Sequence, residues 1–387
     1  MPHVELPGEL AHETERLASL AREQSAENEQ ARALSPELVR GLREAGLLRA
    51  GAPTQLGALQ APPVVTLACA ERVARGDASA GWCVSIACTS SLLAGWLPEP
   101  GAAEVLGGGD DVAAGVWAPR GRATPVDGGL RVSGRWAFCS GISHSNWLFA
   151  GCVLEDGGEG AGEGGAPVLR VVAMPTAELE ILDTWHTGGL RATASNDAVA
   201  EELFVPSERV LSLLGAEPRL DERLYRFPAF GYFALSIAAA ALGNARGAID
   251  DLMELALEKV GLGQTRTLAE RPATQSAVAQ AEAGLEAARA LYYEAIEAAW
   301  DAAAEGPVET QERLGLRLAA THAVQTSAAV ARAMYDLGGG SAIYERSPLQ
   351  RRFRDAHTAT AHFQVSLPTW ELMGRVLLGL PARTEQL

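Results

Sequence analysis

Lysine is almost absent from this sequence of 387 residues, in which Lys259 is the only one. Acidic side chains outnumber lysine and arginine by 48 to 32, so the formal net charge is −16. A strongly acidic surface repels phosphate backbones, and we therefore expect no nucleic-acid partner.

Long apolar runs are missing as well. No window approaches the ~18 consecutive apolar residues that a transmembrane helix needs, so we expect no membrane partner. The first 21 residues, MPHVELPGELAHETERLASLA, are acidic and amphipathic. They lack the basic start and apolar stretch of a secretory signal, which predicts a cytoplasmic protein.

Cysteine pairs and metal-ligand clusters are also lacking. The five cysteines form no C-x-x-C motif, and an odd number argues against a disulfide framework. His357 and His362 lie five positions apart, about 140° around an expected helix, so they do not form the i,i+4 pair of a metal site. We predict buried reduced thiols and no metal.

Hydrophobic spacing predicts an α+β multidomain protein with three segments. Residues 1–112 carry helical periodicity, which indicates an N-terminal α-helical domain. Residues 113–212 contain short apolar runs separated by turn signals such as Asp127-Gly128, typical of a middle β-barrel or sandwich domain. Residues 226–387 are helical again and predict a C-terminal four-helix bundle, whose last helix we expect over about 350–378.

Four local stretches, in this order along the chain, resemble the acyl-CoA dehydrogenase superfamily. They are GRWAFCSG at 134–141, GGLRAT at 188–193 with LFVP at 203–206, LGGGS at 337–341, and RRFRDA at 351–356. Within that superfamily the chain looks most like the two-component flavin monooxygenases. The stretches that match them are Ser140-Gly141 with Trp147, LDTWH at 182–186, and the segment 353–362.

Two departures separate the chain from the dehydrogenases of this superfamily. The resemblance puts their catalytic glutamate shortly after the R-D-A stretch or on the first bundle helix, and neither place holds an acid here. Their R-x-x-F-G motif for the FAD pyrophosphate is replaced by GLGQT at 261–265. Arg266 follows and could hold a single phosphate, which suits FMN or a loosely bound FAD.

The resemblance implies a monooxygenase that hydroxylates an aromatic, polycyclic or amine small molecule through a C4a-hydroperoxyflavin. Its reduced FMN or FAD would come from a separate flavin reductase, with molecular oxygen as co-substrate. Such chemistry needs a dry pocket, a hydrogen bond near flavin N5 and a proton handler near the substrate. The resemblance places Ser140 at the flavin contact and His362 over the reactive edge, as the catalytic candidates.

The resemblance also suggests residues that hold the two ligands, although each also fits an ordinary core or turn position. The cofactor-binding candidates are Trp117, Trp136, Phe138, Ser140, Arg266, Gly338 and Gly339. The substrate-binding candidates are Trp82, Phe230, Tyr232, Phe233 and Phe363.

Two other functions remain open at this point. One is a flavin dehydrogenase, acting for example on an acyl thioester, with a base that the sequence does not reveal. The other is a non-catalytic member of the fold that binds a ligand. Because the bundle makes the subunit contacts in this superfamily and closed symmetric oligomers are common, we expect a homotetramer.

Overall fold

The computed structural model describes residues 6–155, 167–214 and 216–387. The first segment is helical: α1 (Gly8–Ala31), α2 (Pro36–Glu44), α3 (Pro63–Gly76), α4 (Ala78–Ser91) and α5 (Glu99–Leu106). Helix α2 begins as its sequence predicts, because the Ser35 hydroxyl accepts the backbone N–H of Leu38 at 3.0 Å and Pro36 follows.

Helix α4 is the central apolar helix of this segment. Together with a following 3-10 turn it makes a stretch, Ala78–Trp96, that is long and apolar enough to cross a membrane. However, 94% of its most apolar window is buried inside the protein. It is therefore packed as a core helix, against α3 and α7.

The strands in the described residues form one seven-stranded sheet in the order β5-β6-β2-β1-β3-β4-β7. Their bounds are β1 (Ala113–Val126), β2 (Gly129–Trp136), β3 (Trp147–Leu154), β4 (Leu169–Pro175), β5 (Glu180–Leu182), β6 (Asp197–Pro206) and β7 (Val210–Leu211). All neighbours are antiparallel except β1 and β3. The β domain expected in the middle of the chain is thus present as one sheet with β5 and β7 at the ends of its strand order.

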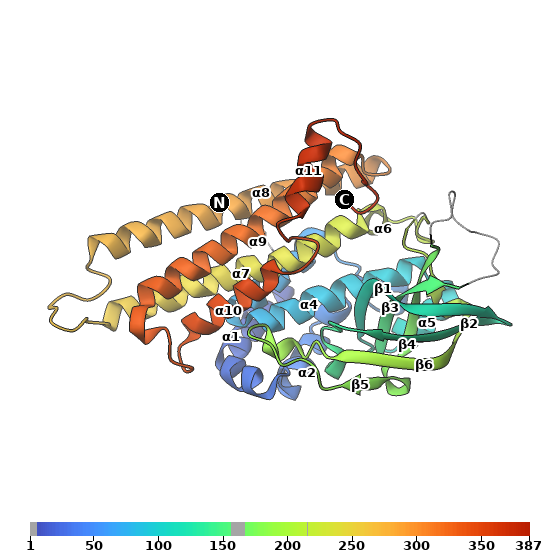
Figure 1. Ribbon diagram of the computed structural model, residues 1–387, viewed down its shortest axis with the longest axis horizontal. Helices are drawn as coiled ribbons and strands as arrows, with labels where there is room; N and C mark the ends of the chain where they lie inside the picture. The colour runs from blue at the N-terminus through green and yellow to red at the C-terminus, as the bar shows by residue number, and fades with distance from the viewer. Residues whose placement is uncertain (1–5, 156–166, 215) are drawn as a thin grey trace.

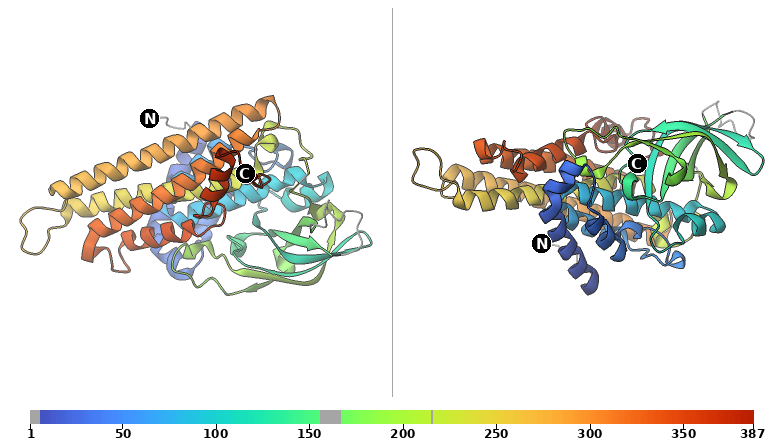
Figure 2. Two further views of the ribbon diagram at one scale, coloured as in Figure 1. Left: turned by 45° about the horizontal axis from the view of Figure 1, so that its top comes forward. Right: turned by 90° about the horizontal axis from the view of Figure 1, so that it is seen from below.

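The last segment contains α6 (Arg223–Arg226), α7 (Ala229–Glu258), α8 (Pro272–Glu305), α9 (Thr310–Gly338), α10 (Pro348–Thr360) and α11 (Thr369–Leu377). Figure 1 shows α7, α8 and α9 side by side with α10 against them, while the sheet lies at the other end of the molecule from the α7–α8 loop. Both views of Figure 2 agree with this arrangement.

One expected helix is interrupted. The helix expected over 350–378 ends at Thr360, and α11 begins only at Thr369. Between them the chain makes short-range turns, such as His362 N–H to the Ala359 carbonyl at 3.1 Å. Pro368 supplies no backbone N–H and disfavours helical backbone in the residue before it, which is consistent with the break.

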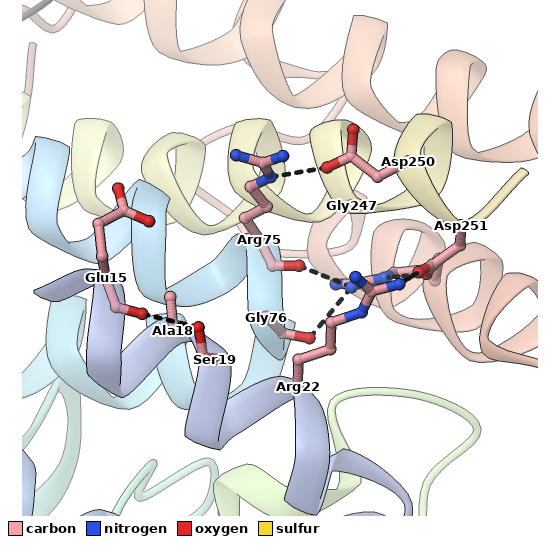
Figure 3. Close-up of a pocket in the computed structure, with 10 residues that line it drawn as sticks. Glu15, Ala18, Ser19, Arg22, Arg75, Gly76, Gly247, Asp250 and Asp251 are labelled. Atoms are coloured by element: carbon pink, nitrogen blue, oxygen red, sulfur yellow. Dashed lines mark hydrogen bonds and ion pairs between the residues drawn. The ribbon is translucent and has the colours of Figure 1, made fainter. Parts of the chain in front are cut away.

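A buried arginine fixes α10 to the helices beneath it. The guanidinium of Arg352 pairs with Asp251 on α7 at 3.0 Å, and both side chains are almost fully buried. It also donates to the carbonyls of Arg75 and Gly76 at the C-terminal end of α3, where positive charge is favoured. Figure 3 shows this region, in which Arg22 from α1 also pairs with Asp251 at 3.0 Å. The segment after α10 therefore starts from a fixed position.

Candidate active site

A cavity of about 740 Å³ lies between the sheet, α4, α7 and the segment that follows α10. This volume is within the range of about 300–1,000 Å³ that is usual for small-molecule sites. Its walls are mainly apolar, and aromatic rings come from every surrounding element: Trp82, Trp117, Phe138, Trp185, Phe233 and Phe363. Trp117 and Phe233 stack with their centroids 5.0 Å apart, which joins the sheet to α7.

The structure brings seven of the proposed site residues together around this cavity. They are Trp82, Trp117, Phe138, Ser140, Phe233, His362 and Phe363. These residues are separated by up to 281 positions in the sequence, from Trp82 to Phe363. The fold therefore makes one site from the candidates that the resemblance proposed for flavin, for substrate and for chemistry.

Three aromatic candidates lie outside the lining. Trp136 is fully buried in the core of the sheet, and its indole N–H donates to the Gly151 carbonyl at 2.8 Å. Successive strand residues point to opposite faces, and the neighbours Arg135 and Ala137 line the cavity, so Trp136 points away from it. The expectation that Trp136 borders the flavin is corrected accordingly.

Tyr232 and Phe230 are on α7 but do not line the cavity, because they lie on other faces of the helix than Phe233. Phe233 and Ile237 on α7 face the cavity, one turn apart. Tyr232 lies about 100° away from Phe233 around the axis. It is fully buried, and its hydroxyl bonds that of Thr66 and the Cys88 sulfur. Phe230 packs edge-on against Phe233 at 5.7 Å, so it supports a wall residue from behind.

Three of the cofactor-binding candidates, among them the proposed phosphate contact Arg266, are at the far end of the bundle. Arg266 is exposed in the α7–α8 loop, and Gly338 and Gly339 are at the end of α9. Lys259, at the start of that loop, donates to the Gly338 carbonyl at 2.6 Å. Figure 1 shows this end remote from the sheet. These residues therefore do not line the cavity of their own chain.

A chain of hydroxyl groups lines part of the cavity. The Trp82 indole N–H donates to Ser140 Oγ at 3.1 Å, Ser140 Oγ lies 2.8 Å from Ser195 Oγ, and Ser195 Oγ lies 2.6 Å from Thr193 Oγ1. Thr193 donates to the Leu190 carbonyl at 2.8 Å. Because that carbonyl can only accept, each hydroxyl proton is directed along the chain. Ser140 is left with one free lone pair, and so acts as an acceptor toward the cavity.

Sequence reasoning missed Ser195 and Thr193. The signal was present as Thr-Ala-Ser at 193–195, directly after the G-G-L-R-A stretch. What brings them beside Ser140 is local backbone: Leu190 and Ala194 have φ of 50° and 47°, in the left-handed region that L-residues seldom adopt. Such backbone persists when the surroundings fix it, and it is concentrated at functional sites.

Asp355 is one group that fixes this loop. Its Oδ1 accepts the backbone N–H of Leu190 at 2.6 Å, which ties α10 to the loop that carries the hydroxyl chain. Burial raises the pKa of the Asp355 carboxyl to about 7. The R-D-A stretch therefore has a structural role, because its aspartate holds the loop in place and titrates close to neutral pH.

His362 lies in the turn after α10 and lines the cavity beside Trp82 and Phe363. The backbone N–H of Gln364 donates to His362 Nδ1 at 3.4 Å, so the neutral ring carries its proton on Nε2. Burial, assisted by the charge of Arg317, lowers the pKa of His362 to about 4. Arg317 also donates to the Gln364 carbonyl at 2.8 Å and so holds this turn. At neutral pH the site thus offers an uncharged imidazole.

Comparison with known proteins identifies the family. Residues 235–367 match the family described as "Acyl-CoA dehydrogenase, C-terminal domain". The indole-3-acetate monooxygenase of Pseudomonas putida is 33% identical over 92% of this chain and 90% of its own length. The oxygenase component of an FADH(2)-dependent resorcinol hydroxylase from Rhizobium sp. is 28% identical over 98% of this chain and 95% of its own length.

A solved structure agrees with these relatives. XiaF from Streptomyces sp., determined in complex with FADH2 and glycerol, superposes with a TM-score of 0.89 at 26% identity, over 96% of both chains. With an apolar cavity that contains a serine acceptor and a neutral histidine, this chain belongs to the acyl-CoA dehydrogenase superfamily, and within it to the flavin-dependent monooxygenases of two-component systems.

Proposed function

We propose that this monooxygenase hydroxylates an aromatic small molecule held between the rings of the cavity and His362. The supporting observation is the composition of the walls, in which aromatic rings share the lining with polar groups that include Ser140 and His362. A few well-placed polar groups in an apolar pocket orient a ligand and exclude water. The named relatives that act on indole-3-acetate and resorcinol support an aromatic substrate.

The residues of the cavity fit a reduced flavin. Bound reduced flavin supplies two electrons and activates molecular oxygen, one atom of which enters the substrate while the other leaves as water. Ser140 has a lone pair free to accept the N–H of the reduced ring, because its own proton is directed to Ser195. Trp117 and Phe138 offer ring faces or edges to a flat ligand. FMN and FAD both satisfy these contacts.

His362 is our candidate for the proton step. The neutral imidazole, with its proton on Nε2, can donate a hydrogen bond to a ligand. To accept a proton from a substrate hydroxyl or amine at Nε2, the ring must first move its own proton to Nδ1, which breaks the bond from Gln364. Since Nδ1 is engaged by Gln364, Nε2 is the nitrogen left for a ligand. The low pKa makes the ring a weak base, which suits brief proton transfer and hydrogen bonding more than stable protonation.

We further propose a cytoplasmic homotetramer supplied with flavin by a separate reductase. Arg266, Gly338 and Gly339 lie too far from the cavity of their own chain to line it. If they bind flavin, they must do so for another copy. The expected assembly is consistent with that requirement, and the resorcinol relative is named as the oxygenase component of its system.

The test of this function is oxygen incorporation. The purified protein is mixed with chemically reduced FMN or FAD, isotopically labelled molecular oxygen and a panel of indoles and phenols, and the products are analysed by mass spectrometry. We expect one labelled oxygen atom in a hydroxylated product. If every aromatic compound is recovered unchanged while reduced flavin is oxidised, the proposed function is wrong.

A further inference from the structure

The positive and negative charges on the side chains that line the cavity do not sum to zero. Arg135 is neutralised by Asp197, with a distance of 2.7 Å between its Nε and the carboxylate. The other oxygen of that carboxylate accepts the Thr184 hydroxyl at 2.9 Å, so both oxygens are engaged. His362 is uncharged at neutral pH because burial lowers its pKa to about 4.

Arg120 is the charge that remains. It lies on β1, beyond Trp117, and lines the same cavity. Among residues 6–155, 167–214 and 216–387 it has neither a hydrogen bond nor an ion pair with another side chain. Within the described part of the chain, the lining thus carries one positive charge that no neighbouring acid compensates, in a protein whose formal net charge is −16.

We infer that Arg120 binds the carboxylate of an aromatic acid substrate and so selects acids over neutral aromatic compounds; this rests on the proposed function. A guanidinium binds a carboxylate through two parallel, charge-assisted hydrogen bonds. An arginine at the edge of an apolar cavity lets the ring of the ligand stay among Trp82, Trp117 and Phe233 while the acid group remains near water.

A flavin phosphate is the other anion that Arg120 could meet. The substrate is favoured because Arg120 shares the cavity with the aromatic walls, whereas the proposed phosphate contact, Arg266, lies at the far end of the bundle. The relative that acts on indole-3-acetate, itself an aromatic acid, agrees with this choice.

The experiment compares matched pairs of ligands that differ only in charge. Binding of indole-3-acetate against indole-3-acetamide, and of phenylacetate against phenylacetamide, is measured by calorimetry on the enzyme with reduced FMN, without oxygen. We expect wild type to prefer the acid by about tenfold or more. Arg120→Met should remove most of that preference. Arg120→Lys should keep part of it, because lysine retains the charge but cannot make the two parallel hydrogen bonds of a guanidinium.

Arg122 provides the matched control on the same strand. It pairs with Glu155 at 3.4 Å and does not line the cavity, so Arg122→Met should keep the preference for acids. The inference is overturned if wild type binds acid and amide equally, or if the preference survives in Arg120→Met. It is also overturned if Arg120→Met weakens the binding of reduced FMN while the ratio of acid to amide affinity stays unchanged. Arg120 would then be a contact to the flavin phosphate.

Turnover separates this inference from the function on which it rests. Oxygen incorporation into acids and amides with equal efficiency would leave the monooxygenase function standing and reject the role of Arg120. Absence of oxygen incorporation into any aromatic compound would reject the function, whereas the binding ratios would still decide whether Arg120 recognises a carboxylate.

Discussion

The indole of Trp82 meets the imidazole of His362 edge to face, with ring centroids 5.9 Å apart and planes inclined by 73°. The same indole donates its N–H to Ser140 at 3.1 Å. One side chain on α4 therefore contacts both polar groups that we assign to the chemistry. A disturbance of Trp82 is expected to affect the flavin contact and the proton step together.

Trp82→Phe removes the N–H but keeps an aromatic ring in the wall. The Ser140 hydroxyl then loses a donor, and its orientation is less well defined. We expect a two- to tenfold loss of product formed per reduced flavin, roughly what one hydrogen bond of 0.5–1.5 kcal/mol contributes. Trp96→Phe is the control, because Trp96 bonds the Ala216 carbonyl at 3.3 Å outside the cavity. Equal losses in both variants would mean that only stability has changed.

His362→Ala tests the proton step. We expect hydroxylation to slow by ~10²–10⁴-fold, the usual effect of removing a positioned acid or base. Reduced flavin should still bind and consume oxygen, but more of that oxygen should appear as hydrogen peroxide. The measurement is product per flavin oxidised. His357→Ala, on the exposed side of α10, serves as control. Wild-type rate and coupling in His362→Ala would make His362 a packing residue.

Asp355→Asn tests the buried carboxyl that holds Leu190. The folded-state pKa of about 7 lies above the ordinary 3.8, so the folded protein favours the protonated form. The stability that this group contributes is complete below pH 3.8 and is lost as pH rises through 7. Asparagine keeps the acceptor without the charge. We expect its stability relative to wild type to rise with pH, by on the order of 4 kcal/mol between pH 4 and 8.

Denaturant unfolding at a series of pH values measures this difference. Asp336→Asn is the control, since Asp336 is exposed on α9 and pairs only with Arg332 at 3.6 Å among the contacts described. A stability difference for Asp355→Asn that does not vary with pH would show that the carboxylate stays ionised in the folded protein.

Arg266→Ala tests the proposed phosphate contact. Loss of one charge-assisted bond should cost ~1.5–3 kcal/mol and weaken binding of reduced FMN about ten- to a hundredfold. The exposed Arg332→Ala provides the comparison. An unchanged dissociation constant for reduced FMN would reject the assignment. Because the contact must come from another copy, it requires an oligomer. A monomeric mass by light scattering at micromolar concentration would argue against the tetramer.

Periodicity predicted the bundle well because its helices are long and each keeps one apolar face. Within the segment 226–387 that the sequence predicts to be helical, α7 runs unbroken over Ala229–Glu258. The same reasoning wrongly predicted that the last helix continues past His362, where the chain turns instead. Local spacing does not reveal such a break, because the contacts that hold the turn, from Arg317 to Gln364, come from a distant helix.

Site residues were harder to predict on the strands, where a side chain can point either into the cavity or into the core of the sheet. Trp117 and Trp136 are the same residue type near the start and end of neighbouring strands, yet Trp117 lines the cavity and Trp136 fills the core. Extended regularly from the pair Gly121–Gly134, the register of β1 and β2 would place both indoles on one face of the sheet, but β1 is irregular between Val116 and Gly121, and residue types do not reveal that irregularity. Likewise Ser195 joins Ser140 only because Leu190 and Ala194 adopt left-handed backbone, which neither residue type suggests.

The break after α10 places His362 outside the helices on either side of it. A side chain within a helix can be repositioned only in steps of about 100°, and an insertion there rotates everything that follows. His362 instead lies in the stretch 361–368, with Arg352 securing the chain before it and Arg317 holding Gln364 after it. Because this stretch lies outside both helices, a change in its length does not rotate α10 or α11 about its own axis, although Val365 within it is packed in the core.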